Sequence, residues 1–335
     1  MTDSNLNSKN SQSNIGTNKD ARIIKGIKKH LQSWDQLFLP ACFIALLLFL
    51  TFSSEFFLTW PNLRNVLLQT SILAIVATGM TFVIIGGGFD LSAGSVVALS
   101  GTAAALAILS LGVPVGILVG LLIGAAIGLF NGFLISKMNL SPFIVTLGTL
   151  VTARGFALAV SGGHTVSNLP RTFTIIGTGN FLGIPYPAII FIAVFVIGHI
   201  VLKYTAFGVK IFAVGGNREA ARLSGIKVNK IIMMTFVICS LCASFAGLVL
   251  AGRIRAGEPT VGVFLELYAI AAVVLGGTNL KGGQGSLAKT LLGVLFIGVL
   301  QNGLNLMNVA YYWQQVAVGV VFVSAATVGA LRAAR

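Results

Sequence analysis

The residues of this sequence that could do chemistry are the few polar side chains inside long apolar stretches. Asp90 follows three glycines in the segment Gly86 to Ser92, and four side-chain amides lie near the ends of other apolar stretches. Carboxylates and amides are costly in hydrocarbon unless they line water or find partners, and they suit a ligand rich in hydroxyl groups. The same side chains could instead cap helices or bond neighbouring helices. The candidate pathway residues are Asp90, Asn131, Gln301, Asn302 and Asn305.

Two patterns that suggest redox chemistry or nucleotide binding have unsuitable surroundings. Cys239 and Cys242 form a C-x-x-C, but they lie in an apolar stretch without a second pair, which favours packing. The segment from Gly283 to Thr290 is one substitution from a phosphate-binding loop, yet that loop requires a soluble strand, loop and helix. The sequence offers no metal-ligand cluster and no set of nucleophile, base and orienting group. We therefore expect a protein that is not an enzyme and carries no metal or other cofactor.

The composition indicates which elements must position these residues. Of 335 residues, 56% are apolar and 9% are charged, whereas an ordinary globular protein has about 25% charged residues. A mean hydropathy of +0.94 is too high for a water-soluble domain, so the solvent must be lipid. The formal charge of +14 does not indicate nucleic-acid binding, because the basic residues lie in the gaps between apolar stretches.

The apolar stretches predict an all-α polytopic membrane protein. About 20 residues of helix cross the 30 Å hydrocarbon layer, and ten stretches approach that length. The first 36 residues are rich in Asn, Ser and Lys, and we expect them to form a disordered tail before a membrane domain at 37–331. The expected transmembrane helices are residues 37–53, 66–87, 93–110, 113–135, 141–160, 185–202, 231–252, 260–278, 286–303 and 308–331.

The distribution of Lys and Arg predicts the orientation of these ten helices. Seventeen basic residues fall on the side of the N-terminus and Arg154 falls inside a helix. Cytoplasmic loops carry the excess of basic residues, so both termini are expected in the cytoplasm. Only four basic residues fall on the opposite side: Arg64, Arg171, Arg253 and Arg255.

Glycine recurs at every fourth residue from Gly112 to Gly132. This spacing places the glycines along one helical face, where another backbone can approach closely. A pore-lining face is the alternative. The residues expected in helix packing are Gly116, Gly120, Gly124 and Gly128.

A weak internal repeat links two glycine-containing segments. Gly86-Gly87 followed by Asp90-Leu91 and Gly94-Ser95 is similar to Gly276-Gly277 followed by Asn279-Leu280 and Gly285-Ser286. Each copy follows a helix expected to run inward. A parallel repeat of this kind is one of the arrangements of transporters.

An inward-facing loop at about 203–230 contains a short predicted helix. Asn217 is placed to cap it, Glu219 lies in its first turn, and Gly225 can end it. The loop contains Glu-Ala-Ala followed by three residues and a glycine. The residues assigned to this motif are Asn217, Glu219, Ala220, Ala221, Arg222, Ser224 and Gly225.

This loop resembles the coupling loop of permeases of ABC importers, which docks on an ATP-binding subunit. Four further segments, spread over roughly residues 60–320, are similar to the ribose-type monosaccharide permeases and also resemble permeases for autoinducer-2. Phe89 and Tyr268 depart from the usual Ile and Asp of that family. The segments are Gly87-Gly88-Phe89-Asp90-Leu91-Ser92-x-Gly94-Ser95, Pro142 to Gly148, Glu266 to Thr278, and Asn302-Gly303-Leu304-Asn305-Leu306.

The resemblance implies a permease subunit in a bacterial inner membrane that imports a ribose-like sugar or autoinducer-2. Its partners would be a second permease copy or paralogue, ATP-binding subunits that hold ATP and Mg, an extracytoplasmic sugar-binding protein and membrane lipid. One alternative is a cation-coupled secondary carrier that uses Asp90 and Glu266, although such a carrier needs no docking helix. Another is an ABC permease for branched-chain amino acids or nucleosides.

Overall fold

The computed structural model describes residues 39–333, with the backbone alone at 325–326 and 328–333. The expected tail at residues 1–36 lies outside the described part. The chain divides into two compact units, Met1–Phe49 and Leu50–Arg335. The described residues of the first unit, 39–49, belong to a helix at Leu39–Ser53.

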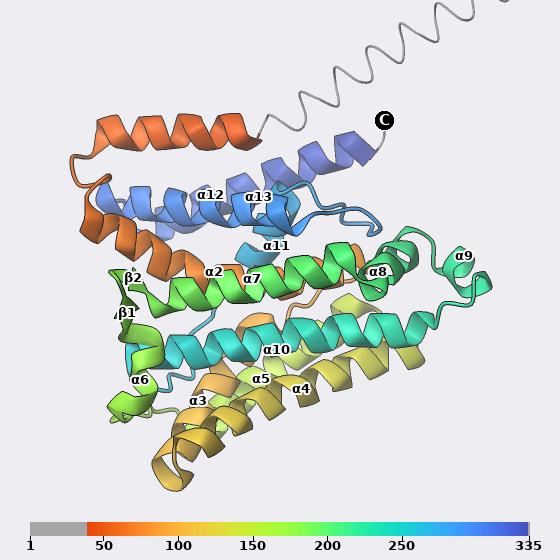
Figure 1. The fold of residues 1–335 in the computed structure, drawn as a ribbon, viewed down its shortest axis with the longest axis horizontal. Helices are drawn as coiled ribbons and strands as arrows, with labels where there is room; N and C mark the ends of the chain where they lie inside the picture. Colours follow the sequence, from red (N-terminus) through yellow and green to blue (C-terminus); the bar gives the residue numbers. More distant parts are fainter. Residues whose placement is uncertain (1–38, 334–335) are drawn as a thin grey trace, which may run out of the picture. The chain divides into compact units, whose positions relative to one another are not determined.

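The second unit is built from helices and one short hairpin (Figure 1). The two strands, β1 and β2, are antiparallel, with Asn180 opposite Pro185 and a turn at Leu182-Gly183 whose positive φ angles suit a tight hairpin. The elements are α2 (Trp60–Ile85), α3 (Ala93–Leu111), α4 (Val113–Lys137), α5 (Pro142–Ser161), α6 (Arg171–Thr178), β1 (Asn180–Phe181), β2 (Ile184–Pro185), α7 (Tyr186–Tyr204), α8 (Ala206–Gly216), α9 (Arg218–Leu223), α10 (Val228–Ile254), α11 (Leu265–Leu275), α12 (Leu287–Leu306) and α13 (Tyr311–Ala333).

The core lies around α2 and α10. The most apolar 18-residue window of α2 is 89% buried and that of α10 is 67% buried, whereas the windows of α4, α5 and α7 are 22–28% buried. Helices α2 and α10 pack on each other, and α10 also packs on α3, α4 and α6. The outer helices therefore present apolar surface outward, as expected of helices that face lipid.

Seven helices of the described residues are long and apolar enough to cross a membrane: α2, α3, α4, α5, α7, α10 and α12. This confirms the predicted class, an all-α polytopic membrane protein. The count of ten remains a prediction. The stretch at 37–53 appears as a 15-residue helix over its described part, and the last stretch forms α13.

The expected continuous helix at 260–278 differs in the structure. Only Leu265–Leu275 is helical, and 11 residues rise about 16 Å, roughly half the hydrocarbon layer. The chain is irregular before it because Phe264 and Gly262 have positive φ angles. Irregular backbone at such a depth is tolerated only where protein or a cavity surrounds it.

Helix α9 lies at one end of the second unit and α6 lies at the other. We call these two ends the α9 end and the α6 end. At the α6 end, a Cβ on Gly252 would lie 3.1 Å from the Gly177 amide, so α10 finishes against α6. At the α9 end, the Gly283 amide donates to Ile85 at the C-terminus of α2 (2.8 Å), just before α12 begins. The segment 255–286 thus runs from one end to the other, with α11 as its only α-helix and irregular chain on both sides of it (Figure 1).

Candidate functional site

Asp90 lies in a turn between α2 and α3, and its carboxylate is fully buried. Gly87, just after the C-cap of α2, has a φ of +81°, a conformation that other residues rarely adopt. Ser92, the N-cap of α3, then donates to Asp90 through its backbone amide (3.0 Å) and its hydroxyl (2.5 Å). The Asp90 carboxylate therefore fixes the shape of the turn from which α3 begins.

The candidate residues Asp90 and Asn131 are brought together through Ser92. The Asn131 amide on α4 donates to the Ser92 hydroxyl (3.1 Å) and accepts from Thr149 on α5 (2.6 Å). Ser240 on α10 donates to the other Asp90 oxygen at 3.5 Å. Side chains of three helices and one turn thus form a continuous buried polar network within the bundle.

Ser92, Thr149 and Ser240 are not among the five candidate pathway residues that the sequence predicts. Each is a small hydroxyl residue, and buried Ser and Thr usually bond to the carbonyl four residues earlier in their own helix, as Thr149 also does with Val145 (3.0 Å). Hydroxyls that serve a network therefore carry no separate sequence signal. These hydroxyls stand out only by their closeness to Asp90 in space. The sequence alone does not show that closeness.

Glu266 lies where the first turns of α3 and α11 meet. A Cβ on Gly94 would collide with the Glu266 carboxylate and with the Gly262 carbonyl, so only glycine fits there. A carboxylate is favourable at the N-terminus of a helix, and Glu266 lies beside two of them. Arg154 of α5 donates to the carbonyls of Pro259 (2.8 Å) and Val261 (2.6 Å), and so ties α5 to the irregular segment before α11.

The remaining candidates form a second group near the α6 ends of α12 and α2. Asn302 and Asn62 exchange two amide hydrogen bonds of 2.8 and 3.0 Å, and both side chains are buried. Asn305 is exposed and accepts from Gln314 of α13 (2.8 Å), while Gln301 is half-buried. The structure therefore divides the five candidate pathway residues into two groups in different parts of the bundle.

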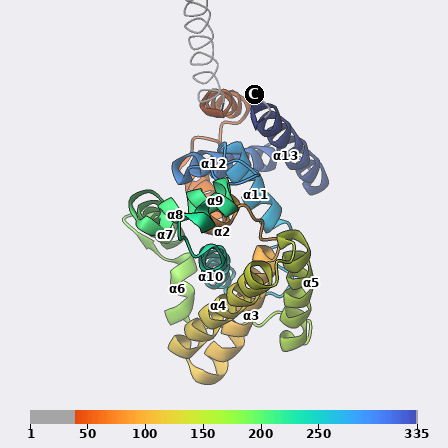
Figure 2. The same cartoon turned by 90° about the vertical axis from the view of Figure 1, so that its right-hand side faces the viewer.

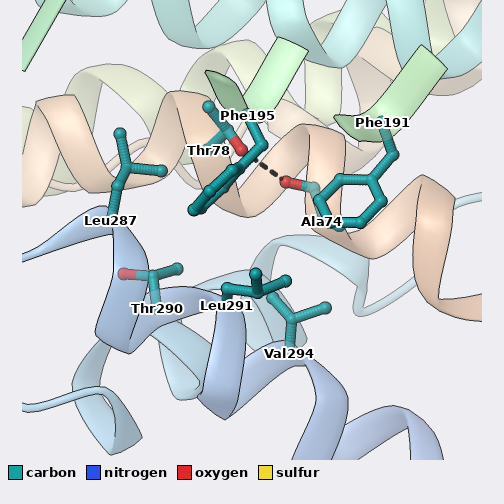
Figure 3. A pocket seen from close by; sticks show the side chains of 8 residues that line it. All are labelled: Ala74, Thr78, Phe191, Phe195, Leu287, Thr290, Leu291 and Val294. Atoms are coloured by element: carbon teal, nitrogen blue, oxygen red, sulfur yellow. Dashed lines mark hydrogen bonds between the residues drawn. The ribbon is translucent and has the colours of Figure 1, made fainter. Parts of the chain in front are cut away.

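An apolar contact between α2, α7 and α12 is shown in Figure 3. Phe191 and Phe195 of α7 lie against residues of the other two helices, and the Thr78 hydroxyl donates to the Ala74 carbonyl of its own helix (2.8 Å). The packing leaves no space for a water molecule. This contact is a helix-packing surface, and none of the five candidate residues lines it.

The glycine row of α4 faces α3 and α10. Gly116, Gly120, Gly124 and Gly128 are all buried, although α4 is mostly exposed. A Cβ on Gly128 would lie 2.6 Å from the Val237 Cα, and one on Gly120 would lie 2.8 Å from a Leu248 methyl group. The glycines let α4 approach the backbone of α10.

Helix α9 carries the candidate coupling residues. The Asn217 side chain accepts from the Ala220 amide (2.9 Å) and caps the helix, and Arg222 forms an ion pair with Glu219 at 2.6 Å. The hydrogen bond from Arg222 lowers the pKa of the Glu219 carboxyl below its usual value. Gly225 has a φ of +79°, and the Ser224 hydroxyl donates to the Ala220 carbonyl (2.9 Å).

Two residues of α9 differ from the sequence expectation. Ala221 is only 4% exposed and packs into its own chain, so it does not present a surface for a partner. Leu223, which is not among the candidate coupling residues, is 77% exposed. An apolar side chain that exposed on a short capped helix is suited to a partner's cleft. Figure 2 shows α9 in front of α2 and α8 when the second unit is viewed from this end.

The base of α9 rests on a cluster of glycines that we call the glycine junction: Gly87, Gly215, Gly216, Gly282 and Gly283. A Cβ on Gly282 would lie 2.9 Å from the Gly87 Cα, and one on Gly283 would lie 2.6 Å from the Gly216 Cα. Arg218, the first residue of α9, donates to the Gly87 carbonyl (3.3 Å). The junction therefore joins α9 to both copies of the internal repeat, including the turn that contains Asp90.

The repeat also has matching local structure. Gly87 and Gly277 have φ angles of +81° and +80°, and each copy closes its helix with the same pair of backbone hydrogen bonds. Asp90 accepts from the amide of Ser92 (3.0 Å), and Asn279 accepts from the amide of Lys281 (2.9 Å). After these hydrogen bonds the paths of the two copies differ. In the first copy, α3 begins beside the buried polar network, whereas in the second copy α12 begins at the α9 end.

These features define a multi-pass membrane protein with a buried polar network, broken helices and a short helix at one end. A family model described as "Branched-chain amino acid transport system / permease component" matches residues 62–326. The chain belongs to this permease family. No solved structure matches the chain.

Three relatives of the chain are named as sugar permeases. The ribose import permease protein RbsC of Bacillus subtilis is 46% identical over 272 residues, which cover 80% of this chain and 84% of the relative. The L-arabinose transport system permease protein AraH of Escherichia coli is 37% identical, covering 87% and 89%. The D-allose transport system permease protein AlsC of Escherichia coli is 36% identical, covering 87% and 90%. The resemblance to the ribose-type permeases is thus confirmed.

Proposed function

We propose that this chain is the transmembrane permease subunit of an ATP-driven importer for a monosaccharide or a similar polyhydroxylated molecule. The names of relatives that are 36–46% identical support a sugar as the substrate. They favour neither a cation-coupled carrier nor a permease for branched-chain amino acids or nucleosides, although the family description names branched-chain amino acids. A ribose-like sugar is the first candidate, and autoinducer-2 is the second.

The observation that carries the proposal is the position of α9. This helix exposes Leu223 and stands on the glycine junction, which contacts the turn of Asp90. A partner that moves α9 would therefore move the chain next to the buried polar network. Close backbone contacts transmit such displacement because packed interiors deform little. Asn217, Glu219, Ala220, Arg222, Ser224 and Gly225 would form the surface around Leu223.

The proposed assembly has four kinds of component. This chain pairs with a second copy or a paralogue, ATP-binding subunits carry ATP and Mg and perform the hydrolysis, and an extracytoplasmic binding protein delivers the sugar. The location is the bacterial inner membrane, with ten transmembrane segments and both termini in the cytoplasm. In this orientation the α9 end faces the cytoplasm, where the ATP-binding subunits lie.

Within this assembly, Asp90 and Asn131 would shape the inner part of the translocation pathway. Their network links the turn before α3 to α4, α5 and α10. Rearrangement of α9 and the glycine junction would expose these groups to a sugar, whose hydroxyls can replace the Ser92 and Thr149 hydroxyls as hydrogen-bond partners.

Co-purification in a mild detergent tests the proposal. The wild-type chain should retain an ATP-binding subunit, and Leu223→Asp should lose it while the amount of membrane-inserted chain stays normal. Leu182→Asp is the matched control, since Leu182 is 85% exposed in the hairpin turn away from α9. An ATP-binding subunit that stays bound to Leu223→Asp and to a chain lacking residues 215–226 would contradict the proposal.

A further inference from the structure

A groove of about 680 Å³ opens beside the first turns of α10. Its walls come from the end of α7, from α8, from the turn after α9 and from α10. One side is apolar and the rim is basic. The lining includes Lys210, Lys227, Lys230, Ile231, Met234 and Ile238.

The rim of the groove gathers unneutralised positive charge. Lys210 comes from α8, and Lys227 and Lys230 come from the beginning of α10. In the described part of the chain, the only ion pair is Glu219 with Arg222, so no carboxylate of that part pairs with the three lysines. The other described carboxylates are Glu55, Asp90, Glu258 and Glu266, and none of them lines the groove.

The floor of the groove is apolar and follows one face of α10. Ile231, Met234 and Ile238 follow the i, i+3, i+7 spacing of one helical face of α10. From Lys230 to Ile238 this face runs about 12 Å along a helix that is long and apolar enough to span the membrane. Met234 and Ile238 are half-buried and so retain surface that an occupant can cover.

The basic rim and the apolar floor together indicate what kind of molecule can occupy the groove. A soluble anion would use the lysines and leave the apolar floor bare. A soluble protein partner would contact the rim but would not reach Ile238 within the hydrocarbon layer. An anionic phospholipid matches both parts, since basic pockets between membrane helices bind anionic headgroups and the acyl chain remains in hydrocarbon.

We propose that the groove is a binding site for an anionic phospholipid. Its phosphate lies among Lys210, Lys227 and Lys230, and one acyl chain lies along Met234 and Ile238. In the orientation proposed above, on which this inference rests for the side of the membrane, the site opens to the inner leaflet. The lipid would also contact Ser224 and Gly225, and so would brace the turn that follows α9.

Lipid retention measured by native mass spectrometry tests the site directly and needs no transport assay. The full-length chain, with any subunit that co-purifies, is extracted from membranes of phosphatidylcholine with a minor fraction of phosphatidylglycerol. The wild type should retain phosphatidylglycerol selectively. Lys227→Gln with Lys230→Gln should weaken that binding about 10- to 30-fold, since each Lys contributes about 1 kcal/mol to binding an anionic lipid surface.

Two further variants separate a built site from general electrostatics. Lys281→Gln with Lys289→Gln removes the same charge from exposed positions at the α9 end outside the groove, and should leave retention unchanged. Met234→Trp fills the floor without changing charge, and should lower retention. Equal losses in both double variants, unchanged retention in Met234→Trp, or release of the lipid when an ATP-binding subunit binds would each overturn the proposal.

Discussion

Asn62 of α2 and Asn302 of α12 hold each other through two side-chain amide hydrogen bonds, 240 residues apart in the sequence. The Asn62 amide also donates to the Phe57 carbonyl at 2.9 Å. The pair is buried in a contact between two apolar helices, where an amide with no partner is costly. Asn302 therefore fixes the register of α2 and α12 in this structure.

The Asn62–Asn302 pair should behave as a unit in stability measurements. Asn302→Leu leaves a buried amide without its partner and should lower the free energy of unfolding in detergent by about 1 to 3 kcal/mol. Asn62→Leu combined with Asn302→Leu removes both amides and should recover part of that loss. A double variant as unstable as the sum of the two single variants would show that the two amides do not depend on each other.

The Asp90 network predicts that hydrogen bonding, and not only charge, shapes the turn before α3. Asp90→Asn keeps an oxygen that can accept from Ser92 and should yield folded protein in near-normal amounts. Asp90→Ala removes the acceptor of two hydrogen bonds and should destabilise the protein by about 1 to 3 kcal/mol. Thermal unfolding of both variants in detergent provides the comparison. Normal stability of Asp90→Ala would remove this role from Asp90.

The glycine row predicts a graded response to added side chains. Gly120→Leu should lower stability by about 1 to 3 kcal/mol through overpacking, and Gly128→Ala should also be damaging because its Cβ meets the Val237 backbone, which cannot move aside. At Gly120 the nearest atom is the end of the flexible Leu248 side chain, so Gly120→Ala should be milder.

Gly155 on α5 supplies the control for the glycine row. Nothing lies within 4 Å of a Cβ placed there, so Gly155→Ala should leave the unfolding temperature unchanged or slightly raised. If Gly128→Ala were as stable as Gly155→Ala, α4 would not require a close backbone approach.

The hydrogen bonds of the Glu258 carboxylate predict that the stability of its loop, which lies outside the membrane-spanning helices, depends on pH. Hydrogen bonds from Thr165 (2.5 Å) and Thr260 (2.6 Å) lower the pKa of Glu258 below its ordinary 4.5. A lowered pKa in the folded protein gives stability that is complete above pH 4.5 and is lost as the pH falls through the lowered value. The backbone pair of Val166 and Gly257 beside it should then open more often in acid.

Hydrogen exchange of the Val166 and Gly257 amides, corrected for the intrinsic effect of pH, measures this opening. In the wild type the protection of these amides should fall as the pH drops below about 4.5, and in Glu258→Gln it should vary little with pH. Equal pH dependence in both proteins would mean that Glu258 does not stabilise the loop.

Several features could be read from the sequence because they depend on neighbouring residues. The cap of Asn217, the positive φ of Gly225, the glycine row and the two repeat copies all rest on spacings within one helix or turn. The link of Asp90 to Asn131 and the pair of Asn62 with Asn302 could not be predicted. These contacts depend on which helices are neighbours and how they are rotated, and apolarity alone sets neither.

The short length of α11 shows a second reason why the structure differs from what the sequence predicts. The sequence from 260 to 278 is apolar enough to suggest a full transmembrane helix, but Glu266 beside Gly94 fixes the start of α11 deep in the bundle. Likewise Ala221 is as small as a docking residue should be, yet it is buried because α9 packs its Ala221 side on the rest of the chain. Residue size identifies a close contact without showing which partner makes it.

The most direct test of the proposed function is sugar uptake by proteoliposomes that contain the co-purified complex and its sugar-binding protein. Labelled ribose, arabinose and allose are offered with and without ATP on the side of the ATP-binding subunits, in the presence of ionophores that abolish ion gradients. The proposal predicts that at least one sugar accumulates only with ATP, that the ionophores have no effect, and that Leu223→Asp abolishes uptake. Accumulation without ATP that collapses with the ionophores would contradict it and would identify a cation-coupled carrier.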